Sequence, residues 1–500
     1  MTTLKETVKS IDCIFSDAAR QEIEADVLLP DYYPEVSRIL NCDVSYSEES
    51  VTVSGDRISV CGQAHIRLLF SSEDGALSSF ETVTKYTKLI VCCETRQDDA
   101  CFVSQTPGDL HYRALAPRRI EVRAAAAVHV RLYRLLSHES VTSADDDTLQ
   151  CRTVEVNVFR PEALCACGFR TSGETQLPCA REDLAAVFGE NARLTVSGTN
   201  VIRNKLMLKG EVEVSFACIC KDGTLYPDET RRFPFSEILD VYGITDASAA
   251  YVCADEVSVS FDLKSGASDA AGCTVTADAK VRLLAGSDGV LTAFDDAYSL
   301  KGEVKCARSA MCLPSFARRY ENRQTFTFEA QCYDENVSDV CLCTANVAAL
   351  GFEREGGAAV VSPALRVNAL MKGNDGGYFF FSRTTDLRFE DPTLPEGAVP
   401  FLGAYCTDLS AGLQPDGKLR FTVTLQTAGF YYVQTDLRLV TEIEEGEETQ
   451  TETEPSLILY YADPDEEVWD IAKRNRTSVG ALENGTAEGD AGRRFVFFSS

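Results

Sequence analysis

The fold is decided by the segment Ala64-His65-Ile66-Arg67-Leu68-Leu69-Phe70, which the pair Asp74-Gly75 follows closely. Apolar and polar residues alternate along most of it, which is the period-two pattern of a half-buried β-strand. Asp-Gly suits a tight hairpin because the central positions of such a turn need positive φ angles. The segment therefore predicts a strand that ends in a hairpin turn.

The same pattern occurs twice more, before Gly223 and before Gly376. Gly75 and Gly223 are 148 residues apart, and Gly223 and Gly376 are 153 residues apart. A glycine, Gly62 or Gly210, precedes each of the first two turns by 13 residues. A period near 150 residues predicts three homologous domains, because solenoid repeats span only about 20–50 residues.

Other features of the pattern are less regular. Asp-Gly pairs at 288–289 and 416–417 predict further hairpins. In the first two copies a Leu-Pro pair precedes a short apolar run, at 36–40 and at 184–188, whose spacing predicts an amphipathic helix. The third copy has Pro363 at the position of Gly62 and lacks the Leu-Pro helix, so it is the degenerate copy.

The composition is that of a folded protein, with 45% hydrophobic and 25% charged residues. No stretch of 18 apolar residues predicts a transmembrane segment, and the first 20 residues do not resemble a signal peptide. The net charge of −29 disfavours nucleic acid and anionic lipid as partners. We therefore expect a cytoplasmic protein.

Catalytic motifs are missing from the sequence. It has no Gly-rich phosphate loop, no dinucleotide fingerprint, no nucleophile elbow and no His-Glu-x-x-His zinc motif. The twenty cysteines are expected to be free thiols in a reducing compartment. The alternative is a metal site built on a Cys-x-Cys pair, at 165/167, 218/220 or 341/343, but no matching ligand set follows. We expect no enzyme activity, no cofactor and no metal.

The C-terminal segment differs in composition from the rest. Residues 442–454 hold seven glutamates and no lysine or arginine, which predicts a solvated linker. Residues 457–462, 468–474, 477–485 and 494–498 then read as strand, helix, helix and strand. From Val468 to Asn484 this segment resembles a LysM module. The module's usual Gly-Asp-Thr is replaced by Asp465-Glu466-Glu467, a change that disfavours a sugar groove and suits a basic protein partner. The candidate partner-binding residues are Asp465, Glu466, Glu467, Trp469 and Asn484.

Three such repeats ahead of a LysM module resemble the SPOCS-domain proteins of endospore-forming bacteria, and the SipL type of coat morphogenetic protein among them. The resemblance implies a non-catalytic scaffold of spore coat assembly in the mother-cell cytosol, at the forespore surface. It also implies that the LysM-like module docks on the ATPase of the coat basement layer, or on another coat protein. The alternative is a glycan-binding protein that uses the module on peptidoglycan.

The expected fold is mainly β, with three tandem β-rich, SPOCS-like domains and a small C-terminal βααβ LysM-like module. The predicted divisions are repeat 1 at 1–150, repeat 2 at 151–305, the degenerate repeat 3 at 306–441, an acidic linker at 442–455 and the LysM-like domain at 456–500.

Overall fold

The computed structural model describes residues 2–92, 95–264, 271–332, 337–374, 376–448, 458–462, 466–488 and 494–498. Nearly all of them lie in β-strands, and the two described helices have seven residues each. The prediction of a mainly β protein is confirmed.

The first third of the chain forms two three-stranded antiparallel sheets, with strand orders β1-β6-β5 and β2-β3-β4. In β3 every second side chain from Ile58 to Leu68 faces the core, apart from the glycine at position 62, as the alternating sequence requires. The strands are β1 (Thr3–Leu28), β2 (Arg38–Ser54), β3 (Arg57–Ser71), β4 (Leu77–Val91), β5 (Ala100–Ala116) and β6 (Arg119–Ala144).

The second third has the same connectivity, with strand orders β7-β12-β11 and β8-β9-β10. Its long central strand β12 pairs with β7 along almost its full length. The strands are β7 (Leu149–Gln176), β8 (Leu184–Ile202), β9 (Lys205–Cys220), β10 (Leu225–Asp240), β11 (Ala249–Leu263) and β12 (Gly272–Ser299).

The remaining third has the orders β13-β19-β18 and β14-β15-β16, and the short β17 also pairs with β15. Its sheet orders match those of the other two thirds, although its sequence departs most from the pattern. The strands are β13 (Gly302–Gln331), β14 (Val337–Glu355), β15 (Ala358–Gly373), β16 (Tyr378–Asp386), β17 (Phe389–Glu390), β18 (Ala398–Leu413) and β19 (Lys418–Glu448).

The glycine turns that defined the repeat occupy equivalent places. Gly75, Gly223 and Gly376 have φ angles of 81°, 85° and 81°, and each donates its N–H over 3.0 Å to the carbonyl three residues earlier. They lie in the β3–β4, β9–β10 and β15–β16 connections. Gly417 also lies in a turn, but between β18 and β19.

Two local predictions are wrong. Gly289 is not in a hairpin: it lies inside β12 opposite Val158, under the guanidinium of Arg160. The two predicted helices are strand instead: β2 begins within the first, and β8 begins at Leu184, where the second was placed. The second of these runs is buried on both faces. Val187 packs into the core of its own third, and Ala186 packs into a core shared between thirds, so both faces need apolar residues. A strand buried on both faces has a continuous apolar run that periodicity cannot distinguish from a helix.

The three thirds pack around common cores. One core joins Leu69, Ile219 and Leu370, and another joins Tyr133, Cys253 and Phe430, with one residue from each third in both cases. The predicted boundaries near 150 and 305 fall close to the short gaps before β7 and β13. They stay a prediction, because the sheet pairing does not show whether a third folds by itself.

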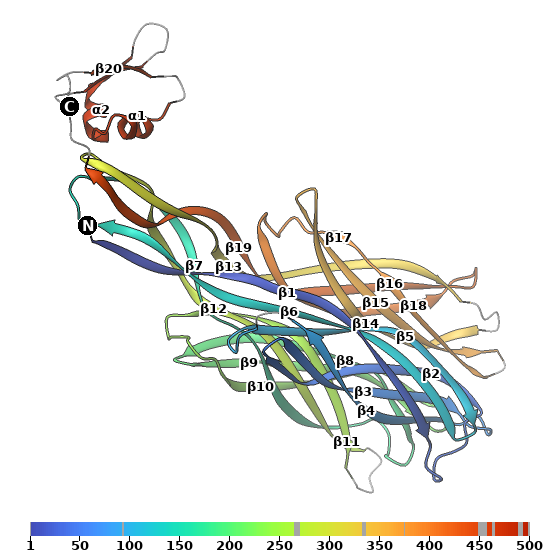
Figure 1. The fold of residues 1–500 in the computed structure, drawn as a ribbon. Coiled ribbons are helices and arrows are strands. Elements are labelled where there is room, and N and C mark those ends of the chain that lie inside the picture. The colour runs from blue at the N-terminus through green and yellow to red at the C-terminus, as the bar shows by residue number, and fades with distance from the viewer. Residues whose placement is uncertain are drawn as a thin grey trace.

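Beyond these cores the long strands continue together toward the N-terminus and the C-terminal helices, as Figure 1 shows. We call this part the stalk. Val8, Val158 and Met311 share one of its apolar cores, and Val141, Phe294 and Val440 share the next. The stalk is made of residues 3–12, 134–144, 149–160, 287–299, 302–314 and 434–448.

The predicted acidic linker begins inside the stalk. Residues 442–448 belong to β19, where Glu442 pairs with Ala307 and Glu445 with Val304. Acidic side chains are tolerated there because the strand is at the surface of the stalk end and its backbone hydrogen bonds are made by β13. Residues 449–457 lie outside the described residues.

The C-terminal module, residues 458–498, has the order β20, α1, α2, β21 and β22 and a sheet of order β20-β22-β21. It differs from the predicted βααβ order by the short strand β21. Ser478 Oγ accepts a hydrogen bond from Ala481 N over 3.3 Å at the start of α2, which is the contact of an N-cap. The elements are β20 (Ile458–Ala462), α1 (Val468–Arg474), α2 (Val479–Gly485), β21 (Thr486–Glu488) and β22 (Arg494–Phe498).

Candidate interface between the C-terminal module and the stalk

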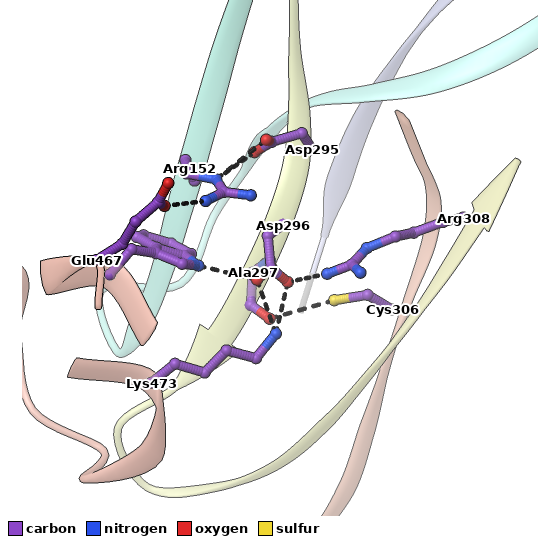
Figure 2. A network of polar contacts seen from close by, with 9 residues as sticks. Arg152, Asp295, Asp296, Ala297, Cys306, Arg308, Glu467 and Lys473 are labelled. Carbon is purple, nitrogen blue, oxygen red and sulfur yellow. Dashed lines mark hydrogen bonds and ion pairs between the residues drawn. The ribbon is translucent and has the colours of Figure 1, made fainter. Parts of the chain in front are cut away.

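The C-terminal module contacts the stalk through a carboxylate at the end of β12. Asp296 exposes 7% of its side chain. Trp469 Nε1 donates to its Oδ2 over 2.8 Å, and Lys473 Nζ lies 2.7 Å from both of its oxygens. The Arg308 guanidinium of β13 completes the set (Figure 2). One buried carboxylate therefore joins three donors from the module and the stalk.

A β-bulge explains how Asp296 reaches the module. The pairing of β12 with β7 shifts register between Phe294 and Asp296, which leaves Asp295 unpaired. Such an extra residue re-aims the neighbouring side chains. Asp295 turns toward Arg152, and Asp296 turns toward α1 (Figure 2).

Helix spacing places the two donors of the module together. Trp469 and Lys473 are four residues apart in α1, so they lie on the same helix face. The other apolar positions, Ile471 and Ala472, are 1% and 0% exposed and pack with Leu482 of α2. The helix thus has one face in the core of the module and one face toward the stalk.

Tyr298 supplies the apolar part of the contact. It lies two residues after Asp296, so both side chains lie on the same face of the strand. The centroid of its ring lies 5.1 Å from the centroid of the Trp469 ring, and the angle between the ring planes is 71°, which is an edge-to-face arrangement. Its hydroxyl donates to the carbonyl oxygen of Thr477 over 2.6 Å. The buried phenol therefore has a hydrogen-bond partner in the module.

Arg152 of β7 binds the rim of this contact. Its Nε lies 2.9 Å from Asp295 Oδ1, and its Nη1 donates to Glu467 Oε2 over 3.1 Å. The guanidinium also lies over the Trp469 ring, 5.5 Å from the ring centroid. Glu467 exposes 66% of its side chain, so water screens this ion pair. The pair therefore contributes about 1 kcal/mol or less to the stability of the contact.

The charge of Asp296 is held by its partners. Burial alone would raise the pKa of this carboxyl group, but hydrogen bonds from Lys473 and Trp469, with the charges of Lys473 and Arg308, lower the pKa below its ordinary value. The carboxylate is therefore ionised at neutral pH, and removing either cation would leave a buried charge less well compensated.

The five sequence-predicted binding residues do not form one surface. Glu466 is mostly buried: it exposes 13% of its side chain, accepts from the Tyr460 hydroxyl over 3.0 Å and pairs with Arg474 at 2.9 Å. Glu467 and Trp469 face the stalk. Asn484 belongs to α2, and the structure describes only its backbone. Asp465 lies outside the described residues.

Sequence reasoning missed Asp296, Tyr298 and Lys473. One signal was available, because two consecutive aspartates interrupt the otherwise apolar end of β12. A carboxylate in such a position is rarely buried without a paired charge. The partner could not be found in the same way, since it lies 177 residues further along the chain.

The cysteine pairs considered as metal ligands do not belong to a metal site in the described residues. Cys165 Sγ and Cys167 Sγ lie 3.7 Å apart on β7. Within the part of the chain that the structure describes, no three His, Cys, Asp or Glu side chains come together as a metal site.

Comparison with known proteins gives one match. Residues 35–114 match the family model described as SipL, SPOCS domain, a segment that holds β2 to β4 and most of β5. No curated protein and no solved structure matches the chain. The two described helices are too short to cross a bilayer. The match supports the SPOCS resemblance in the first third of the chain.

Proposed function

We propose that the chain is a non-catalytic scaffold of endospore coat assembly that acts in the mother-cell cytosol at the forespore surface. The observation that carries this proposal is the SPOCS match at residues 35–114. The absence of catalytic motifs from the sequence is consistent with it. In this role the C-terminal LysM-like module binds a protein partner, the ATPase of the coat basement layer.

The arrangement of the thirds supports a scaffold. Cores shared by three thirds resist relative movement of the sheets, because packed interiors deform little. The stalk extends from this body and holds the module at its far end (Figure 1). A binding module is thus kept away from the sheets, and their surfaces stay open to a second partner.

The test is capture of partners by the full chain. The immobilised protein is offered the purified coat ATPase, and in parallel it is sedimented with purified peptidoglycan. We expect retention of the ATPase and no sedimentation with glycan. Ile471→Asp, which puts a charge in the core of the module, should abolish the retention. Asp278→Asn on the exposed part of β12 is the matched control and should bind normally.

Sedimentation with peptidoglycan in the absence of ATPase capture would replace this proposal with the glycan-binding alternative. Capture that survives Ile471→Asp would place the ATPase site on the β-sheets and not on the module.

A further inference from the structure

The contact between α1 and β12 has the chemistry of peptide recognition. The module supplies the Trp469 N–H and the Lys473 ammonium for one carboxylate, and the Thr477 carbonyl for one phenol hydroxyl. The indole ring packs edge-to-face against the aromatic ring of that phenol. We call this set of groups on the module the receptor face.

The carboxylate and the phenol that the receptor face binds belong to three consecutive residues of an extended strand, Asp296-Ala297-Tyr298. Residues i and i+2 of a strand share one face, so an extended segment needs only the pattern Asp-x-Tyr to fill the receptor face. Arg152 beside this segment also meets Glu467. A segment of this kind does not need to belong to the same chain.

We infer that the receptor face binds extended Asp-x-Tyr segments of the partner protein, and that Asp296-Ala297-Tyr298 of β12 occupies the face until such a segment displaces it. This inference rests on the proposed function, because it names the chemistry of the partner that the module takes. A basic side chain next to the partner's segment replaces Arg152 at Glu467.

The balance between the two segments follows from their connection. A segment on the same chain acts at an effective concentration on the order of millimolar, so a partner segment in solution competes with it. The Asp296 carboxylate is moreover shared with Arg308 of the stalk, so release of the module leaves it paired with one cation. The occupied state therefore reduces affinity for the partner without preventing its binding.

The chain contains a built-in probe of this equilibrium. Trp469 is the only tryptophan in the sequence, so its fluorescence reports on the receptor face alone. Transfer of the indole from the buried contact into water shifts its emission to longer wavelength. Asp296→Asn keeps the side-chain shape and removes the charge, and we expect this variant of the full chain to show that shift. Asp278→Asn on the same strand is the control and should not.

The ligand probe is a synthetic peptide with the sequence of residues 291–300. We expect it to reverse the emission shift of Asp296→Asn, and to bind the unmodified chain about ten-fold or more weakly because β12 competes. A second peptide, with asparagine at the position of Asp296, should be inactive on both. If Asp296→Asn unfolds the chain, Tyr298→Phe is used in the same way. This substitution removes only the hydroxyl that donates a hydrogen bond to the Thr477 carbonyl.

Two results would overturn the inference: an emission spectrum unchanged in both variants, or equal affinity of both peptides. The last arm offers the peptide to the complex with the captured ATPase. Displacement supports the inference, whereas an ATPase that stays bound in excess peptide refutes it and leaves the proposed function intact. Peptide binding without any ATPase capture refutes the proposed function.

Discussion

The indole nitrogen of Trp469 lies 2.8 Å from Asp296 Oδ2, although 173 residues separate the two in the sequence. Trp469 was predicted to bind a partner protein, and in the structure it links the module to the stalk. Tyr298 and Arg152 of the stalk both contact its ring. Any change at Trp469 therefore affects docking as well as the fold of the module.

Trp469→Phe separates these two roles. Phenylalanine keeps an aromatic ring against Tyr298 but loses the N–H that Asp296 accepts. A hydrogen bond to a charged group contributes about 1.5–3 kcal/mol, so we expect docking to weaken by about that amount while the module stays folded. Hydrogen exchange of the amides in residues 468–482 measures both. Faster exchange along the whole helix pair, down to the buried Leu482, would show that the module itself had unfolded.

Acid should release the module. The folded-state pKa of Asp296 lies below its ordinary value of 3.8, so the contact contributes stability above that value. This contribution is lost as the pH falls through the folded-state pKa. We expect the emission of Trp469 to shift to longer wavelength in a transition below about pH 4. The transition should be absent in Asp296→Asn, and a transition that persists there would assign the change to another group.

A second titration is expected where the first two thirds meet. Glu256 of β11 is opposite Lys280, which pairs at 2.6 Å with Glu48 of β2. Burial raises the pKa of Glu256 to about 7. The charge of Lys280 lowers this pKa, and the charges of nearby carboxylates raise it. The charged form is thus the destabilising one, so folding stability falls as the pH rises from about 4.5 through 7.

Glu256→Gln tests this sign, since glutamine resembles the protonated acid. The variant should gain up to about 3 kcal/mol over the natural chain at pH 8 and nothing at pH 4. Urea denaturation at the two pH values measures the difference. Equal stability of both chains at pH 8 would contradict the predicted titration.

Gly210→Ala tests the close packing behind the repeat. Gly210 is opposite Phe235, and a Cβ at this position would lie 2.0 Å from the carbonyl oxygen of Thr195 and 2.8 Å from the Phe235 ring. Gly62 occupies the equivalent position in the first third, where it is opposite Tyr86 and close to the ring of that residue. We expect the substitution to cost about 2–3 kcal/mol, since overpacking forces side chains and backbone to shift.

The matched control is Gly198→Ala in the neighbouring strand β8, where an added Cβ meets no atom within 4 Å. The denaturation midpoint should fall clearly for position 210 and hardly change for position 198. Similar midpoints for both variants would show that the aromatic rings move aside freely.

The sequence by itself determined the features that depend on near neighbours. Alternation identified the strand that became β3, and Asp-Gly identified the turns at Gly75 and Gly223, because strand periodicity and positive φ are properties of a few adjacent residues. The helix expected at residues 468–474 was identified for the same reason and coincides with α1.

Only the tertiary structure decided what lies on the second face of each element. The residues at 184–188 resemble a helix because β8 packs on two cores, and one of these exists only when three thirds meet. The partner of Asp296 could not be found from neighbouring residues, because a bulge turns its side chain toward Lys473, which follows 177 residues later in the chain. Burial and charge pairing depend on distance in space, and the sequence encodes them only through the packing of the whole chain.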